Sequence, residues 1–172
     1  LVLVILISGL RILESTVFNQ KTPEDPYLSK TIVRDGVEYY PRQDITVIMV
    51  LGIDKFGPMT ESGSYNNSGV ADVISLLIFD NTNKNARILQ LNRDTMTDVP
   101  WLDVLGNCGG TRFQQICRAF NSGDGGRDSC LNTVEAVASL LFEAPVRRYI
   151  RLSMSAISVM NQLVGGVSVK IS

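Results

Sequence analysis

The chain has 172 residues, of which 45% are hydrophobic and 19% are charged, a composition that indicates a folded domain and excludes a disordered chain. Its 16 basic and 17 acidic side chains leave a net charge of -1, which argues against nucleic-acid binding, because such domains usually carry a strong basic excess. No histidine occurs, which excludes Ser-His-Asp and Cys-His catalysis, imidazole metal sites and histidine pH switches. A metal held by the remaining oxygen ligands would be a hard ion, Mg, Mn or Ca.

The N-terminal part of the chain divides into an apolar run, a polar segment and a short β-prone segment. Residues 1–10 (LVLVILISGL) are too few to span a membrane, which takes about 20 apolar residues, so they fit either half of a cut span or a buried helix or strand. Residues 15–30 are polar and contain two prolines, which is typical of a linker. Residues 31–40 predict a hairpin that turns at Asp35-Gly36.

Three apolar segments predict neighbouring strands of one sheet. Residues 45–53 (ITVIMVLGI) form a nearly continuous run rich in β-branched residues, typical of a strand covered on both faces. Residues 73–79 and 86–91 are separated by the turn-forming sequence DNTNKN. These last two segments are therefore expected to form an antiparallel hairpin.

The second half of the chain mixes helical and strand patterns. Helices are expected over residues 111–121, from an N-cap at Asn132 onward, and over residues 155–163, where Gly165-Gly166 would stop the last one. Residues 146–152 alternate like a strand. Because strands and helices interleave, the expected fold class is α/β, with a central mixed β-sheet flanked by helices on both faces.

Three cysteines, Cys108, Cys117 and Cys130, lie in the middle of the chain. They contain no CxxC pair, so a thiolate zinc site is not expected. Two interpretations remain open. Cys117 and Cys130 form a disulfide across the Gly-rich segment between them, if the domain lies outside the cytosol, or all three are small buried hydrophobic residues.

Four charged residues lie at strand ends that the expected topology brings to one edge of the sheet. Asp72 precedes the second strand and Arg93-Asp94 follow the third, so an antiparallel hairpin places them close together. If the first strand runs parallel to the third, Asp54 at its end reaches the same edge. In open α/β sheets, ligands tend to bind at the carboxyl ends of strands.

The chemistry of such a cluster favours phosphoryl transfer. Crowded carboxylates repel one another unless a cation neutralises them, and Mg is typically held by one or two carboxylates plus phosphate oxygens. Arg93 can grip a phosphate through two parallel hydrogen bonds, while a remaining carboxylate acts as a base. The competing interpretation is structural: the aspartates cap turns, and Arg93-Asp94 is a surface ion pair. Arg147, Arg148 and Arg151 form a second basic group. On an alternating strand Arg147 and Arg151 share a face, and the group either binds an anion or is a solvated face.

In order and spacing, several segments resemble the LytR-CpsA-Psr (LCP) family, and most closely its members from clostridia-like Gram-positive bacteria. The resemblance covers residues 45–172, and its more specific parts are RDTM with its strand and the late VGGV. The other matching segments are VIMVLGIDK, GVADVISLLIFDNTNKNARILQLNRDTMTDVP, Gln115-Ile116-Cys117 to Ala119-Phe120, CLNTVEAVASLL and YIRLSMSAISVMNQLVGGVSV.

The resemblance implies a cell-membrane protein with a single N-terminal membrane helix and an extracytoplasmic domain. Residues 1–14 would be the remnant of that helix, residues 15–43 a linker and hairpin, and residues 44–172 the LCP domain. The implied activity is that of an Mg-dependent phosphotransferase. It would move a glycopolymer, such as teichoic acid or capsular polysaccharide, from a polyprenyl-pyrophosphate carrier to peptidoglycan.

By position, the resemblance assigns roles to the same four residues. It implies that Asp54 and Asp72 bind Mg (or Mn), that Arg93 holds the pyrophosphate as a catalytic and substrate-binding residue, and that Asp94 belongs to the catalytic site. The family's later Arg-rich segment, which completes the pyrophosphate clamp, would follow the last residue of this sequence. The alternative function is therefore a non-catalytic module that binds polyprenyl phosphate or a wall polymer. For the prenyl tail, the helices expected at residues 111–120 and 132–142 are candidate walls.

Overall fold

The computed structural model describes residues 31–57, 65, 69–167 and 169–170. The segments expected to be a membrane-helix remnant and a linker, residues 1–14 and 15–30, lie outside this part, and the proposed domain boundaries remain predictions. Within the described part, no helix combines the length and the apolar character that crossing a membrane requires.

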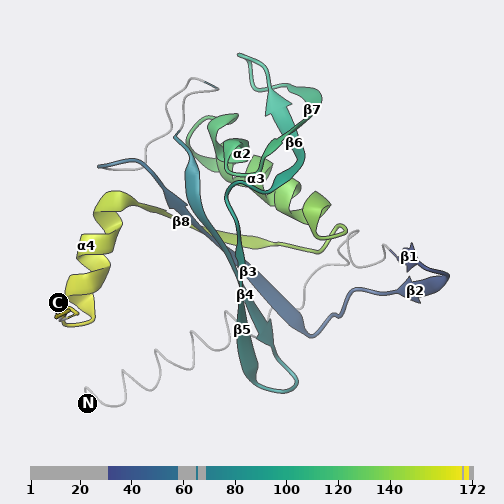
Figure 1. Cartoon of the computed structure of the whole chain (residues 1–172), viewed down its shortest axis with the longest axis horizontal. Coiled ribbons are helices and arrows are strands. Elements are labelled where there is room, and N and C mark those ends of the chain that lie inside the picture. Colours follow the sequence, from purple (N-terminus) through teal and green to yellow (C-terminus); the bar gives the residue numbers. More distant parts are fainter. Residues whose placement is uncertain (1–30, 58–64, 66–68, 168, 171–172) are drawn as a thin grey trace, which may run out of the picture.

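A central mixed sheet of four strands, in the order β5-β4-β3-β8, organises the molecule (Figure 1). Its strands are β3 (Ile45–Ile53), β4 (Ala71–Asp80), β5 (Asn85–Leu91) and β8 (Arg148–Ser153). Strand β4 is antiparallel to both β3 and β5, and β8 is parallel to β3. Strands β3 and β5 therefore point the same way, and their C-terminal ends share one edge with the start of β4. The α/β class and the mixed sheet confirm the expected fold.

One face of the sheet carries the core. Cross-strand partners share a face, so the fully buried pairs Met49–Leu76 and Leu51–Ile74 point together toward the helices. The covering helices are α2 (Arg118–Asn121) and α3 (Arg127–Leu140). Helix α4 (Met154–Leu163) follows β8, contacts it and lies away from α2 and α3 (Figure 1). As predicted, α4 ends before Gly165 and Gly166, which take left-handed φ values of 83° and 82°.

A second sheet consists of the antiparallel strands β6 (Met96–Leu102) and β7 (Cys108–Gln115), and β6 packs against α3. The helix predicted over residues 111–121 is therefore wrong for most of its length, since only residues 118–121 are helical. The helical spacing of Ile116, Cys117 and Phe120 reflects their burial around the short helix α2, whereas Phe113 is 69% exposed on β7. Pairing with the preceding strand β6 decides the structure of this segment.

The start of α3 also differs from the prediction. The helix begins at Arg127, with Gly126 at the cap position, and not after Asn132. Asp124 Oδ1 accepts hydrogen bonds from the backbone N–H groups of Gly126 (2.7 Å) and Ser129 (3.2 Å), which supplies the capping function about two turns before Asn132.

The short hairpin predicted near the N-terminus is present. Strands β1 (Ile32–Arg34) and β2 (Val37–Tyr39) are antiparallel. Asp35 and Gly36 take positive φ values of 51° and 76°, as a two-residue hairpin turn requires.

Asn132 ties three elements together inside the core. Its side chain is 5% exposed, and its Nδ2 donates to the carbonyl oxygens of Pro100 (2.9 Å) on β6 and Ala119 (2.7 Å) on α2. This one amide supplies a donor to both carbonyl oxygens, so α3 is hydrogen-bonded to both β6 and α2.

We expect Asn132→Ala to lower the free energy of unfolding by about 1–3 kcal/mol, because buried carbonyl oxygens lose their donors. Urea unfolding followed by circular dichroism measures the change. Glu135→Ala, on the exposed side of the same helix, is the control and should shift stability by less than about 0.5 kcal/mol. Equal effects of the two variants would contradict the bridging role of Asn132.

All three cysteines are free thiols in the structure, with Cys117 and Cys130 buried and Cys108 exposed. Burial raises the pKa of the Cys130 thiol to about 11 and also raises that of Cys117. The reactive thiolate is therefore suppressed at both buried positions.

We expect Ellman's reagent to modify Cys108 rapidly in the native protein and Cys117 and Cys130 only slowly. After denaturation without reductant, all three thiols should react. Detection of only Cys108 in the denatured chain would instead establish the Cys117–Cys130 disulfide.

Candidate functional site

The four charged residues singled out from the sequence lie at the edge of the sheet where β3 and β5 end and β4 begins. Asp54 directly follows β3, Asp72 is the second residue of β4, and Arg93-Asp94 form the turn between β5 and β6. All four are exposed to solvent. The strand order thus brings together carboxylates that lie far apart in the sequence.

Asp72 owes its position to a β-bulge. Between the pairs Gly52–Val73 and Ile53–Ala71, the register advances by one residue on β3 and by two on β4, so Asp72 is the inserted residue. Ala71 keeps its side chain in the core, fully buried, while the carboxylate of Asp72 remains 41% exposed. In a regular strand that buries Ile74, the alternation of side chains would also turn residue 72 toward the core. The bulge instead directs the Asp72 carboxylate outward.

Asp54 is fixed by the backbone opposite it. Its N–H donates to the carbonyl oxygen of Val70 (3.1 Å), and its Oδ1 accepts from the N–H of Val70 (2.7 Å). Gly69 takes φ +92°, and a Cβ there would come within 3.1 Å of Asp54 Oδ1. A side chain at residue 69 would therefore crowd the Asp54 carboxylate as well as strain the backbone.

Arg93 lies between two carboxylates. Its Nη1 donates to Asp72 Oδ1 in a hydrogen-bonded ion pair, and its Nε lies 3.7 Å from Asp94 Oδ1. The Arg93 side chain is 44% exposed, so water screens these pairs and they contribute little to stability. The guanidinium is thus positioned by its neighbours but accessible to an anionic ligand.

Two residues that sequence reasoning missed hold Asp94 in place. Gln115 Nε2 donates to Asp94 Oδ1 (2.9 Å), and Asn92 Oδ1 accepts from the Asp94 N–H (2.9 Å). Asn92 lies in the same turn and was visible as a turn-forming residue. Gln115 was not, because it reaches the site only through the unexpected pairing of β7 with β6.

The thiol of Cys117 lies beneath this cluster. Burial is the main reason why the pKa of Cys117 is raised, and the charges of Asp94 and Asp72 raise it further, while those of Arg93 and Arg118 oppose the shift. Its N–H donates to the carbonyl oxygen of Arg93 (3.2 Å). Arg118, the first residue of α2, is therefore a second cation near this edge.

The carboxylates at this edge fit a partial ligand set for a divalent cation. Asp54 and Asp72 supply the hard oxygen atoms that Mg prefers. In the described ranges, no group of three or more His, Cys, Asp or Glu side chains is arranged to hold a metal ion. Protein atoms would thus provide one or two ligands, and phosphate oxygens and water the others.

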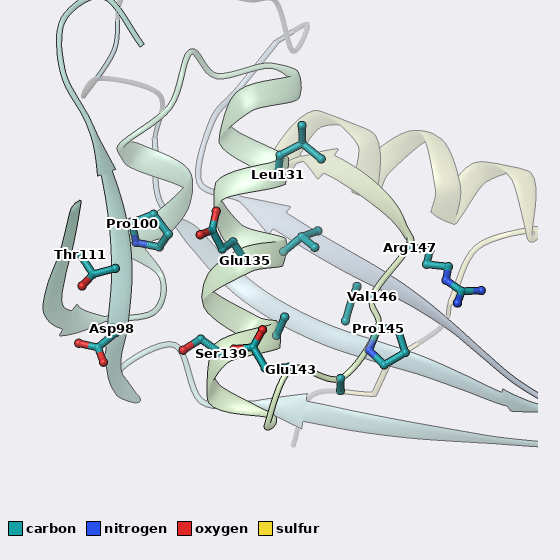
Figure 2. Close-up of a pocket in the computed structure, with 13 residues that line it drawn as sticks. Asp98, Pro100, Thr111, Leu131, Glu135, Ser139, Glu143, Pro145, Val146 and Arg147 are labelled. Atoms are coloured by element: carbon teal, nitrogen blue, oxygen red, sulfur yellow. The ribbon is translucent and has the colours of Figure 1, made fainter. Parts of the chain in front are cut away.

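A cavity in the described part of the chain lies away from this cluster. It has a volume of about 630 Å³ and is bounded by α3, β6 and the segment 143–147. Figure 2 shows Asp98 and Thr111 on the strands opposite Glu135 and Ser139 of α3. Helix α3 lines one side of this cavity, and residues of β6 and β7 line another. The groove for a prenyl tail between two helices remains a prediction, and residues 111–115 contribute a strand to it and not a helix. No charged residue of the sheet-edge cluster lines this cavity.

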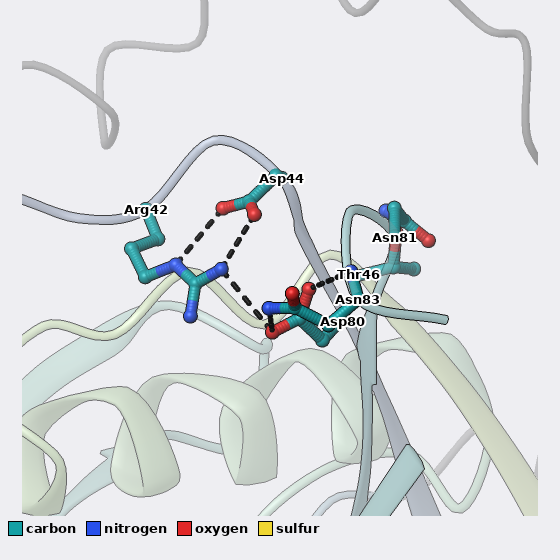
Figure 3. A network of polar contacts seen from close by, with 6 residues as sticks. All are labelled: Arg42, Asp44, Thr46, Asp80, Asn81 and Asn83. Carbon is teal, nitrogen blue, oxygen red and sulfur yellow. Dashed lines mark hydrogen bonds and ion pairs between the residues drawn. The ribbon is translucent and has the colours of Figure 1, made fainter. Parts of the chain in front are cut away.

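A further polar network lies at the opposite end of the sheet and is structural. Arg42 donates to Asp44 (Nε to Oδ1, 3.0 Å) and to Asp80 (Nη2 to Oδ2, 3.2 Å), as Figure 3 shows. The hydrogen bonds from Arg42 are the main reason why the pKa of Asp44 falls to about 2. The network fastens the segment before β3 to the turn after β4.

The second basic group predicted from the sequence does not join the cluster. The pairing of Leu51 with Arg151 and of Met49 with Tyr149 places Arg151 on the face of β8 that points to the core, whereas Arg147 precedes the strand. Arg151 Nη1 donates to the carbonyl oxygen of Gly125, before α3, and Arg147 lines the 630 Å³ cavity.

Solved structures share the fold. The chain is 21% identical to TagT (YwtF) with bound octaprenyl pyrophosphate lipid, with a TM-score of 0.53 over 88% of this chain and 51% of that one. It is 22% identical to TagT bound to LIIa-WTA (TM-score 0.53, 84% and 46% covered) and 23% identical to TagV from B. subtilis (TM-score 0.51, 73% and 42% covered). The chain therefore spans about half the length, or less, of these structures.

No curated protein matches the chain. The model of the LytR_cpsA_psr family matches residues 14–172, which is most of the sequence and includes all four residues of the sheet-edge cluster. The chain belongs to the LytR-CpsA-Psr family.

Proposed function

We propose that this domain binds the pyrophosphate of a polyprenyl-linked cell-wall glycopolymer at the sheet edge and transfers the polymer to a peptidoglycan hydroxyl. The observation that carries the proposal is the accessible guanidinium of Arg93, held between Asp72 and Asp94 at the sheet edge where β3 ends at Asp54. Family membership and the ligands in the two TagT structures, octaprenyl pyrophosphate lipid and LIIa-WTA, support it.

Each residue has a distinct part in this proposal. Arg93 donates hydrogen bonds to pyrophosphate oxygens and stabilises the charge that develops as the phosphoryl group is transferred. Asp94, fixed by Gln115, orients Arg93 or accepts the proton of the attacking hydroxyl. Asp72 neutralises Arg93 when no ligand is bound, so pyrophosphate has to displace it from the guanidinium.

Asp54 and Asp72 are the residues that would hold an Mg (or Mn) ion. Such an ion supplies charge neutralisation to the pyrophosphate oxygens. Because Asp72 accepts a hydrogen bond from Arg93 in this structure, it would have to give up this bond in order to hold the ion. The chain would use one carboxylate for two purposes, to hold the cation and to keep the guanidinium in place.

The second candidate function is binding without turnover. It is favoured by the small number of charged groups that the described residues contribute, with no group of three or more acidic side chains arranged around a metal. Binding needs only Arg93 and a partial ligand set, whereas transfer also needs an activated acceptor hydroxyl.

We expect Arg93→Ala to weaken binding of a short-chain polyprenyl pyrophosphate. A hydrogen bond to a charged group contributes about 1.5–3 kcal/mol, which corresponds to roughly a ten- to hundredfold loss of affinity. Isothermal titration calorimetry measures it. Arg87→Ala, an exposed arginine of β5 away from this edge, is the control and should bind normally.

Because the Arg93 ion pair is exposed, Arg93→Ala should change the free energy of unfolding by less than about 1 kcal/mol. Unchanged affinity in a folded Arg93→Ala protein would contradict the proposal. Product release from a lipid-linked saccharide, measured on the same proteins, separates transfer from binding alone.

We expect Asp72→Asn and Asp54→Asn to differ when divalent ions are absent and to act alike when Mg is present. Without divalent ions, Asp72→Asn should bind pyrophosphate more tightly than the parent, because its guanidinium is no longer neutralised. With Mg, both variants should lose the metal-dependent gain in affinity. Calorimetric titrations with and without Mg check this, with Asp98→Asn as the control. A parent protein whose affinity is independent of divalent ions would contradict the metal site.

A further inference from the structure

The tip of the β6–β7 hairpin presents two aliphatic side chains to solvent. Val104 is 80% exposed and Leu105 is 78% exposed, in the turn that joins the two strands. Figure 1 shows the hairpin extending away from the central sheet beyond α3. Exposing two adjacent aliphatic side chains to water is unfavourable in free energy. An exposed apolar pair of this kind suggests a surface that contacts another partner.

Hydrogen bonds to one aspartate make the tip rigid. Asp103 Oδ1 accepts from the N–H groups of Leu105 (2.8 Å) and Asn107 (2.9 Å), and Asn107 Nδ2 donates to Asp103 Oδ2 (3.2 Å). These bonds, led by those from Asn107, lower the pKa of Asp103. The turn therefore holds Val104 and Leu105 outward and prevents them from folding back onto the hairpin.

The tip is also braced against the body of the domain. Gly106 has φ +83°, and a Cβ at this position would overlap the ring of Tyr65. The Tyr65 hydroxyl in turn donates to Asp128 Oδ2 (2.9 Å) in the first turn of α3. Both the close approach and the positive φ require glycine at residue 106.

Behind the tip lie an aromatic ring and a cation. The guanidinium carbon of Arg112 lies 4.4 Å from the centre of the Trp101 ring. In the part of the chain that the structure describes, Arg112 makes no ion pair with a carboxylate. The tip thus carries aliphatic side chains at its end, with a tryptophan and an arginine behind them. Proteins that contact a bilayer surface show the same order of side chains.

We propose that this tip docks onto the surface of a lipid bilayer, with Val104 and Leu105 entering the apolar boundary and Arg112 facing anionic head groups. The inference rests on the proposed function, because a lipid-linked pyrophosphate is presented at the bilayer surface and β6 begins directly after the Arg93-Asp94 turn. A protein partner fits less well. A stable protein interface buries about 800 Å² on each side, whereas inserted side chains each gain from transfer into lipid.

The single tryptophan of the chain provides a local probe, because Trp101 lies next to the tip. The experiment mixes the full chain with vesicles of phosphatidylcholine and phosphatidylglycerol whose acyl chains are brominated. We expect a blue shift and quenching of Trp101 emission, both lost in the double variant Val104→Ser/Leu105→Ser. The quenching of Trp101 is divided by the fraction of protein that sediments with the vesicles. Protein that binds the vesicles through another segment then lowers the normalised quenching and is not mistaken for insertion of the tip.

Val33→Ser/Val37→Ser is the matched control, since it removes two exposed valines from the β1–β2 hairpin. It should leave the quenching of Trp101 unchanged. Arg112→Gln should reduce quenching on vesicles that contain phosphatidylglycerol and have no effect on pure phosphatidylcholine.

Three results would overturn the assignment: no quenching in vesicle-bound parent protein, equal quenching in the tip variant, or self-association in solution that the tip variant abolishes. The last would assign the tip to a second copy of the chain. The outcome is separable from that of the proposed function, because binding of a short-chain polyprenyl pyrophosphate in solution needs no vesicle. Loss of one result with retention of the other identifies which proposal fails.

Discussion

The arrangement of the candidate site depends on the antiparallel position of β4 between β3 and β5. Because β4 runs opposite to β3 and β5, the ends of those two strands and the start of β4 lie at one edge of the sheet. Residues from three separate segments of the chain therefore lie at this edge. The bulge at Asp72 adds a local exception within this register, because Ala71 stays in the core while the next side chain turns outward. Changing the register by one residue would bury Asp72 and expose Ala71.

The site combines solvent-accessible charged side chains with hydrogen bonds that hold them in place. The ion pairs of Arg93 are half exposed, so they can be exchanged for a ligand at little cost to the fold. Hydrogen bonds from neighbouring segments hold the charged residues in place. The N–H of Val70 donates to Asp54, and the side chain of Gln115 on β7 donates to Asp94. The N–H of the buried Cys117 donates to the carbonyl oxygen of Arg93. An anion-binding site of this kind is preorganised by backbone and neighbouring elements and not by the charges alone.

The β6–β7 hairpin links the site to a more distant part of the molecule. It starts at the Arg93-Asp94 turn and is bonded through the carbonyl of Pro100 to Asn132 in the middle of α3. It ends in a tip braced by Tyr65 against the first turn of the same helix. A rigid connection therefore runs from the sheet edge to the exposed pair Val104–Leu105.

The sequence by itself determined the central sheet and the four charged residues, because their signals are local. Continuous β-branched runs predict strands such as 45–53, turn residues between two runs predict their antiparallel pairing, and this pairing brings Asp72 to Arg93. What only the tertiary structure decided depends on contacts between elements whose own sequence patterns are ambiguous. Residues 108–115 have an ambiguous pattern until β6 pairs with them, and this pairing alone brings Gln115 to Asp94. The bulge at Asp72 likewise follows from how β3 and β4 align beside Gly52, where an added Cβ would lie 2.9 Å from the Cβ of Val73.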